Sequence, residues 1–258
     1  MRLTVRPFQV PKIGNVAEEC EDAFFWDEAK QLFAIADGAT DSAFQRLWAM
    51  LLVKGFVSHP PNFSKSEEIV FGSPPRVRTW FGGWLQSQQE KWNESIDWDN
   101  IPWHGQNKAR QIGGLATFMG IHLSSNESLW RGIAIGDCNL FQFRKETDWY
   151  VTWWGPLIYA DEFGTNPAAL SSISKNYAVT WNYVTWIAGQ YYPGDVIVLT
   201  TDALGAWLTS AIWERQRNSW QSLLNLQSQE EFSRFIDNLR KEKNIKNDDT
   251  SMLTIQID

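Results

Sequence analysis

The order of strand-like and helix-like segments constrains the fold of this chain more than any other feature of its sequence. Runs typical of strands occur at both ends and in the middle, and amphipathic stretches typical of helices separate them. The order is strands, helices, strands, helices and a final strand. Because it lacks the strict alternation of a parallel α/β sheet, it predicts an α+β fold with helices on packed antiparallel sheets.

Local signals assign the individual segments. Two apolar runs, Ala23 to Trp26 and Gln31 to Ala36, surround a polar turn and predict a hairpin. Apolar residues recur on one face of Ser42 to Val57 and predict a helix. Further strands are predicted for Leu3 to Gln9, Leu115 to Leu123, Leu129 to Ile135, Leu140 to Arg144, Ala178 to Ala188, Val196 to Thr201 and Ser251 to Ile257, and further helices for Arg78 to Asn93, Leu204 to Leu226 and Gln229 to Lys243. The remaining long segments, predicted as loops or an irregular flap, are His59 to Pro75, Asp97 to Gly105 and Trp154 to Ser174.

Composition limits the class of protein. With 258 residues, 43% of them hydrophobic, the chain has enough apolar material for one sizeable core, and we expect a single domain over residues 1–258. A net charge of -7 argues against nucleic acid as a partner, since binding to phosphate backbones depends on Lys and Arg. No signal peptide and no apolar stretch of about 18 residues is seen, so we expect no membrane association. Two cysteines without a CxxC pair favour a soluble, reducing, cytoplasmic setting.

Acidic residues lie where predicted strands begin or end. They are Glu21, Asp22, Asp37, Asp137, Asp202, Asp248 and Asp249. Strand ends on one rim of a sheet can bring carboxylates that are distant in sequence together, and such oxygen ligands suit Mg²⁺ or Mn²⁺. Because clustered carboxylates repel one another without cations, the pattern predicts a metal site, with two ions able to activate a water and hold a phosphoryl group.

Six segments resemble, in chain order, the motifs of the metal-dependent (type 2C) protein phosphatases. Glu21-Asp22-Ala23 is similar to the E-D-x start, Asp37-Gly38 to the D-G motif, and Gly136-Asp137 to the V-G-D-S-R turn. The segments together span nearly the whole chain: Glu21 to Ala23, Phe33 to Gly38, Gly113 to Thr117, Ala134 to Asn139, Gly194 to Leu204 and Asp248 to Thr254. The resemblance implies an αββα sandwich of two packed antiparallel sheets flanked by helices.

The resemblance also implies residue roles. Asp37 would bridge two Mg²⁺ or Mn²⁺ ions, Glu21 and the Gly38 carbonyl would serve one of them, and Asp202 and Asp248 would hold the other. Asp37, Asp202 and Asp248 would be the catalytic residues, acting through a metal-activated water. Three further acids would lie in an outer sphere or at a third ion: Asp22, Asp137 and Asp249.

The chain departs from the family pattern at several positions. Ala17 stands where the family often has an Arg that binds substrate phosphate, and Ala39 stands where eukaryotic members have a His. Asp41 adds a carboxylate after Asp37-Gly38, and we expect it to cap the Ser42 helix. These losses affect substrate binding more than the metal site, because every expected carboxylate is present.

Three functions remain open. The first is a metal-dependent hydrolase that removes phosphate from phosphoserine or phosphothreonine of a protein, including a partner Ser/Thr kinase. The second is a catalytically weak regulatory module that binds a phosphorylated partner, and the missing Arg and His favour it. The third is a hydrolase of small phosphate esters.

We expect the other notable residues to stabilise the structure rather than take part in chemistry. Most of the 16 tryptophans are expected to pack in the core, with an aromatic partner surface as the alternative. Cys20 and Cys138 adjoin expected metal-site acids, but alternation along a strand directs their thiols into the core. His122 lies in a strand-like run and is expected to be structural. The flap is expected to be partly packed.

Overall fold

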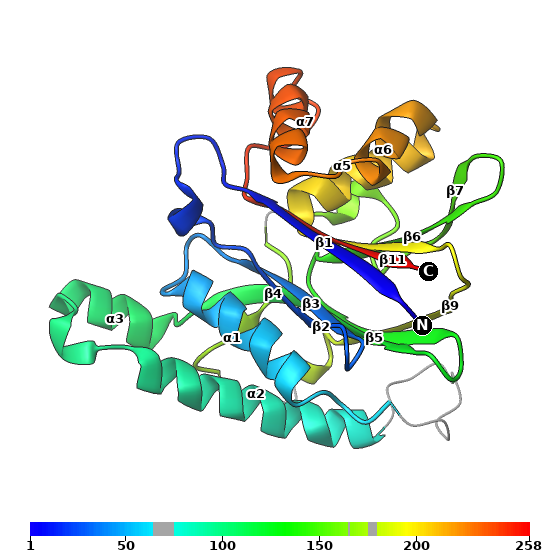
Figure 1. The fold of residues 1–258 in the computed structure, drawn as a ribbon. Coiled ribbons are helices and arrows are strands. Elements are labelled where there is room, and N and C mark those ends of the chain that lie inside the picture. The colour runs from blue at the N-terminus through cyan, green and yellow to red at the C-terminus, as the bar shows by residue number, and fades with distance from the viewer. Residues whose placement is uncertain (64–74, 165, 175–179) are drawn as a thin grey trace.

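Two antiparallel sheets form the centre of the computed structural model, which describes residues 1–63, 75–164, 166–174 and 180–258. The first sheet has the strand order β1-β11-β10-β6-β7. Its strands are β1 (Leu3–Val10), β11 (Thr250–Ile257), β10 (Val196–Thr200), β6 (Asn139–Lys145) and β7 (Trp149–Gly155). The N-terminal strand therefore pairs with the C-terminal strand, which brings the two ends of the chain together (Figure 1).

The second sheet has the order β2-β3-β4-β5-β9, and a two-residue strand pairs with β4. Its strands are β2 (Ala23–Asp27), β3 (Leu32–Gly38), β4 (Leu115–Ser124), β5 (Leu129–Ile135), β9 (Thr185–Gln190) and the short β8 (Leu170–Ser171). The predicted hairpin is β2–β3, in which Ala23 pairs with Ala36. A buried apolar layer of both sheets' inner faces, including Ile35, Ile121, Leu199 and Ile255, joins the two sheets.

Helices cover the two outer faces (Figure 1). On the second sheet, α1 (Gln45–Ser58) packs directly on β2, β3 and β4, and α2 (Pro75–Ser95) packs on α1. On the first sheet lie α5 (Asp202–Trp213), α6 (Arg217–Leu224) and α7 (Gln229–Lys241). Further helical segments in the described part of the chain are α3 (Trp103–Gln111), η1 (Ala17–Glu19), η2 (Trp98–Asn100) and η3 (Ala160–Glu162). The predicted α+β fold with two packed antiparallel sheets, an αββα sandwich, is confirmed.

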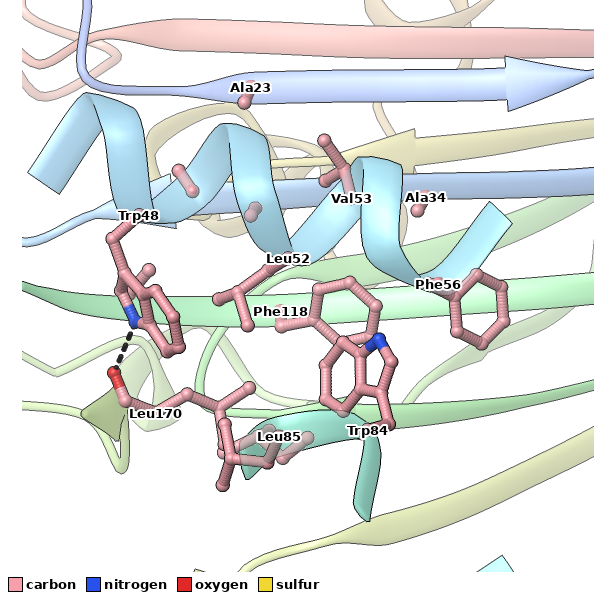
Figure 2. Close-up of a cluster of buried hydrophobic side chains, with 14 of the residues drawn as sticks. Ala23, Ala34, Trp48, Leu52, Val53, Phe56, Trp84, Leu85, Phe118 and Leu170 are labelled. Carbon is pink, nitrogen blue, oxygen red and sulfur yellow. Dashed lines mark hydrogen bonds between the residues drawn. The ribbon is translucent and has the colours of Figure 1, made fainter. Parts of the chain in front are cut away.

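The helix α1 forms the centre of one outer core because its buried face is apolar along its whole length. Trp48, Leu52, Val53 and Phe56 are all fully buried. Figure 2 shows these side chains between α1 and the sheet, with Phe118 of β4 below them. The tryptophans of α2 join this cluster, which agrees with the expectation that most tryptophans serve packing. Trp103, at the start of α3, and Trp213, at the end of α5, are exceptions, with 75% and 51% of their surfaces exposed.

Several local predictions need correction. The predicted loop Asp97 to Gly105 contains η2 and the beginning of α3, and Trp149–Gly155 forms a strand that the sequence did not indicate. The predicted helix Leu204 to Leu226 is two helices, separated at Arg215, which has a left-handed φ of 57°. The last strand of the second sheet begins at Thr185, and residues 178–179 of the predicted strand lie outside the described part of the chain. The same holds for residues 64–74 of the predicted loop.

The expected cap of α1 is also wrong. Asp41 does not cap this helix, which begins after Phe44 in a left-handed conformation, φ 52°, without a side-chain cap. Ser42 instead donates its hydroxyl to the Ala39 carbonyl and accepts the amide of Leu115. The segment after Asp37-Gly38 is therefore a turn tied to β4, and it delays the start of the helix by three residues relative to the prediction.

No helix in the described ranges is long and apolar enough to cross a bilayer.

Candidate metal centre

Strand ends from both sheets meet at one cavity of about 480 Å³. Asp37 lies at the end of β3, Asp137 in the turn between β5 and β6, and Asp202 directly after β10. Asp248, before β11, and Asp41, in the turn after Gly38, complete the acidic lining. The sandwich thus brings together five carboxylates that are separated by up to about two hundred residues in the sequence.

Glycines allow two of these turns to approach their neighbours. A Cβ on Gly38 would lie 2.8 Å from the carbonyl oxygen of Glu21, so only glycine fits between β3 and that segment. Gly136, before Asp137, has a φ of +85°, and a Cβ there would lie 2.5 Å from the Ala168 carbonyl oxygen. The two glycines therefore fix the positions of the acids beside them.

Burial and mutual repulsion disfavour the charged form of these acids. Burial, followed by the charges of Asp22 and Asp202, raises the pKa of Asp37 well above its ordinary value. Burial and the charge of Asp202 raise the pKa of Asp137 to about 7. Burial also raises the pKa of Asp202, although Lys246 opposes this effect. A cation in the cavity would relieve the cost of keeping these groups ionised.

Asp22 and Asp249 lie behind the cavity lining. Asp22 is buried and accepts the hydroxyl of Thr201 at 2.9 Å through one oxygen, and burial raises its pKa well above the ordinary value. Asp249 accepts the backbone amides of Lys12 and Glu21 at 2.8 and 2.7 Å. Both acids therefore contact protein donors behind the lining, and Asp249 holds the segment that carries Glu21.

Glu21 is already engaged by neutral and cationic donors. Its carboxylate accepts the Thr40 hydroxyl at 2.6 Å and the Gln45 amide at 2.7 Å. The Nζ of Lys12 lies 3.6 Å from the same carboxylate. Among the residues expected to bind metal, Glu21 is the one that the structure places outside the cavity lining, held against the turn after β3.

Lys246 occupies the cavity with the acids. Its Nζ lies 2.5 Å from Asp248 and 3.3 Å from Asp202, so one ammonium group bridges the two carboxylates. Partial burial works against the charged form, but the hydrogen bond to Asp248 and the nearby carboxylates raise the pKa of Lys246 above its usual range. The sequence reasoning missed this residue, although its position two residues before Asp248 places it beside the site.

The donor chemistry fits hard divalent cations, although the side chains do not enclose one as they stand. Within the described residues, no three His, Cys, Asp or Glu side chains are placed so that they could hold a metal ion. One oxygen each of the buried acids Asp22 and Asp137 has no hydrogen-bond partner. Buried carboxylate oxygens without partners are the donors that Mg²⁺ or Mn²⁺ would use. The carboxylate oxygens of Glu21, and those beside Lys246, already have polar or charged partners.

The two cysteines are buried, His122 packs against a neighbouring ring, and the flap is partly packed, as the sequence predicted. Cys20 and Cys138 are buried, and burial raises the pKa of both thiols. His122 stacks on Phe63 with ring centroids 5.4 Å apart, on the outer side of the second sheet. The flap is partly packed, because Leu170 is fully buried and Phe163 lies against Gly205 of α5.

The sequence matches no family model and no curated protein. Many solved structures are nonetheless similar in fold, among them the following three. The photosystem II phosphatase PBCP aligns over 100% of this chain and 99% of its own, with 17% identity and a TM-score of 0.58. The serine/threonine phosphatase Stp1 from Staphylococcus aureus covers 100% of this chain and 96% of its own, at 10% identity and a TM-score of 0.63. The catalytic domain of the phosphatase PstP in complex with two manganese ions covers 99% of both chains, at 12% identity and a TM-score of 0.59.

The chain has the type 2C phosphatase fold. At these identities the likeness concerns the fold alone. In this chain β1 pairs with β11, and strand ends converge on one acidic cavity. A cavity of about 550 Å³ beside α2 is larger, but Glu90 is the single carboxylate among the described residues of its lining. The acidic cavity of this fold is therefore the better candidate for a catalytic centre.

Proposed function

We propose that this chain, as one domain over residues 1–258, is a divergent metal-dependent phosphatase acting on phosphoserine or phosphothreonine of a protein. The observation that carries the proposal is the convergence of Asp37, Asp137, Asp202 and Asp248 on one cavity. It is supported by the buried acids with unpaired oxygens and by a fold like that of PstP with two manganese ions. The substrate class, a phosphorylated protein such as a kinase partner, rests on the activity named for the similar structures.

The residues divide the work of binding and positioning. Asp37, Asp202 and Asp248 would hold two Mg²⁺ or Mn²⁺ ions, with the Gly38 carbonyl and Glu21 beside them, and Asp137 would serve a third ion or the outer sphere. When bound, such ions supply an activated water and positive charge facing the phosphoryl group. Asp22 would orient the acids in front of it through Thr201, and Asp249 would hold the Glu21 segment through two backbone amides.

Binding of the phosphate itself has fewer candidates in this chain. Ala17 lies exposed in η1 and offers no charge. The cationic side chains nearest the acids are Lys12 and Lys246. The cytoplasmic setting is part of the same proposal, since both cysteines are free and buried.

A catalytically weak module that binds a phosphorylated partner is the second candidate. The protein's own contacts at the site favour this function, because Glu21 has three polar partners and Lys246 contacts two of the expected metal ligands. In such a module the cavity would bind a phosphate group without hydrolysing its ester bond.

The first experiment is hydrolysis of p-nitrophenyl phosphate with and without Mn²⁺, by the wild type and by Asp37→Asn. We expect activity that requires Mn²⁺ and falls at least about a hundredfold in the variant, because the central carboxylate is lost. Asp148→Asn is the matched control, since Asp148 is exposed in the turn between β6 and β7. A panel of phosphopeptides then separates a protein phosphatase from a hydrolase of small phosphate esters.

An inactive wild type that still binds Mn²⁺ would favour the binding module over the enzyme. Activity that survives in Asp37→Asn would contradict the assigned site.

A further inference from the structure

Lys246 differs from an ordinary surface lysine because it contacts two carboxylates on separate elements. Asp202 begins α5 and Asp248 precedes β11, and the Nζ of Lys246 lies 3.3 Å from one and 2.5 Å from the other. The side chain of Asp202 is 12% exposed and that of Asp248 is 27% exposed. An exposed ion pair contributes little to stability, but partial burial of both acids strengthens this one.

The charge balance of the cavity shows what this contact replaces. Among the described residues that line the cavity, Lys246 is the one cationic side chain, and the acidic ones are Asp37, Asp41, Asp137, Asp202 and Asp248. The ammonium group thus lies between the two carboxylates that the proposed function assigns to one metal ion. It supplies a single positive charge where a divalent cation would supply two.

The lysine has a route out of the site. Its side chain is 57% exposed, so rotation into solvent needs no rearrangement of the core. The short segment between α7 and β11 also holds its own shape, because the Asp248 amide donates to the Lys246 carbonyl at 3.0 Å. Displacement of the ammonium group would therefore leave the backbone and the two carboxylates in place.

We propose that Lys246 is a tethered cation that holds the metal-free site together and competes with the divalent ion for Asp202 and Asp248. This inference rests on the proposed function, since it assumes that these two acids are metal ligands. A bound ion must displace the ammonium group from both carboxylates, so the lysine weakens the affinity of the site and makes occupancy depend on the concentration of free metal ion. Lys12 beside Glu21 has a similar arrangement at the other expected ligand group.

The test measures Mn²⁺ binding by titration calorimetry and thermal unfolding in EDTA and in Mn²⁺, without any assay of turnover. We expect Lys246→Met to bind Mn²⁺ roughly fivefold more tightly, the effect of removing an ion pair of about 1 kcal/mol from the competition. In EDTA the same variant should unfold at a lower temperature than the wild type, because Asp202 and Asp248 lose their counter-charge. Added Mn²⁺ should raise its unfolding temperature by more than it raises that of the wild type.

Two further variants isolate the cause. Lys241→Met removes the same charge from an exposed position in the last turn of α7 and should leave the affinity at the wild-type value. Lys246→Gln keeps a hydrogen-bond donor without the charge, and it should show the same gain in Mn²⁺ affinity as Lys246→Met. If the methionine variant folds poorly, the glutamine variant alone tests the proposal.

The outcomes separate this proposal from the function on which it rests. Tighter binding in both Lys246 variants, with Lys241→Met unchanged, would support it. Equal affinities in all four proteins would overturn it and leave the metal site standing. Binding of Mn²⁺ by none of them would overturn the metal-dependent function and this proposal together.

Discussion

Asp195 lies in the turn before β10, and its side chain is completely buried. Arg144 donates to both of its oxygens, from Nε at 2.7 Å and from a terminal nitrogen at 2.9 Å. Gln142 and the Tyr192 amide donate to one of the same oxygens. This residue belongs to the Gly194 to Leu204 segment that resembles the phosphatase motif, but its contacts are structural: they join β6 to the turn between β9 and β10.

Asp195→Asn should lower the free energy of unfolding by about 2–3 kcal/mol. Breaking a buried ion pair costs about 3–5 kcal/mol, and the partial exposure of Arg144 reduces this. Urea denaturation followed by circular dichroism measures the change. Asp148→Asn, at an exposed turn, should change stability by less than about 0.5 kcal/mol. A loss no greater than that of the control would contradict the structural role of Asp195.

Helix α1 connects the outer core to the flap. The indole of Trp48 is fully buried and donates to the carbonyl oxygen of Leu170 at 2.9 Å, as Figure 2 shows. Leu170 belongs to β8, which pairs with β4 at Ala116, close to the cavity lining. One helix residue thus fixes the end of a flap that the sequence described as irregular.

Trp48→Phe should destabilise the protein by about 1–3 kcal/mol, because a buried hydrogen bond is lost and the smaller ring leaves space. The change is read from urea denaturation by circular dichroism. Trp103→Phe is the matched control, since Trp103 is 75% exposed and should tolerate the change within about 0.5 kcal/mol. Equal effects of the two substitutions would show that Trp48 does not anchor the flap.

At the scale of the whole molecule, the sandwich concentrates acids at one rim while the chain as a whole carries a net charge of -7. Burial raises the pKa values of Asp22, Asp37, Asp137 and Asp202. The folded protein without metal therefore binds more protons than the unfolded chain between the ordinary carboxyl pKa and the raised values, and its stability falls as pH rises through this window.

In EDTA, the free energy of unfolding should be higher at pH 5 than at pH 8, and Mn²⁺ at pH 8 should restore stability. Asp137, whose pKa is raised to about 7, contributes to this loss. Asp137→Asn should accordingly stabilise the metal-free protein at pH 8 relative to the wild type, by on the order of 1–3 kcal/mol. Urea denaturation at the two pH values measures both effects. A metal-free protein that is more stable at pH 8 than at pH 5 would contradict the raised values.

The sequence by itself determined the elements and the acids. Strand alternation and helical periodicity are local properties, so β3, β10 and α1 could be predicted from short windows, and Asp37 and Asp202 could be selected because each directly follows such a strand. The weaker local signals failed where tertiary contacts decide the conformation. Trp149–Gly155 is a strand because it pairs with β6, and the turn before α1 is held by Leu115 rather than by an Asp41 cap.

Only the tertiary structure decided which charges meet. No pattern in the sequence reveals that Lys246 reaches Asp202 as well as its neighbour Asp248, or that Thr40 and Gln45 hold Glu21, because Asp202 and Glu21 come from other elements than these partners. Electrostatic and hydrogen-bonding contacts depend on distances of a few ångströms, which the packing of the two sheets sets. The sequence therefore supplied the acids of the proposed metal centre, and the fold decided which lysine stands among them.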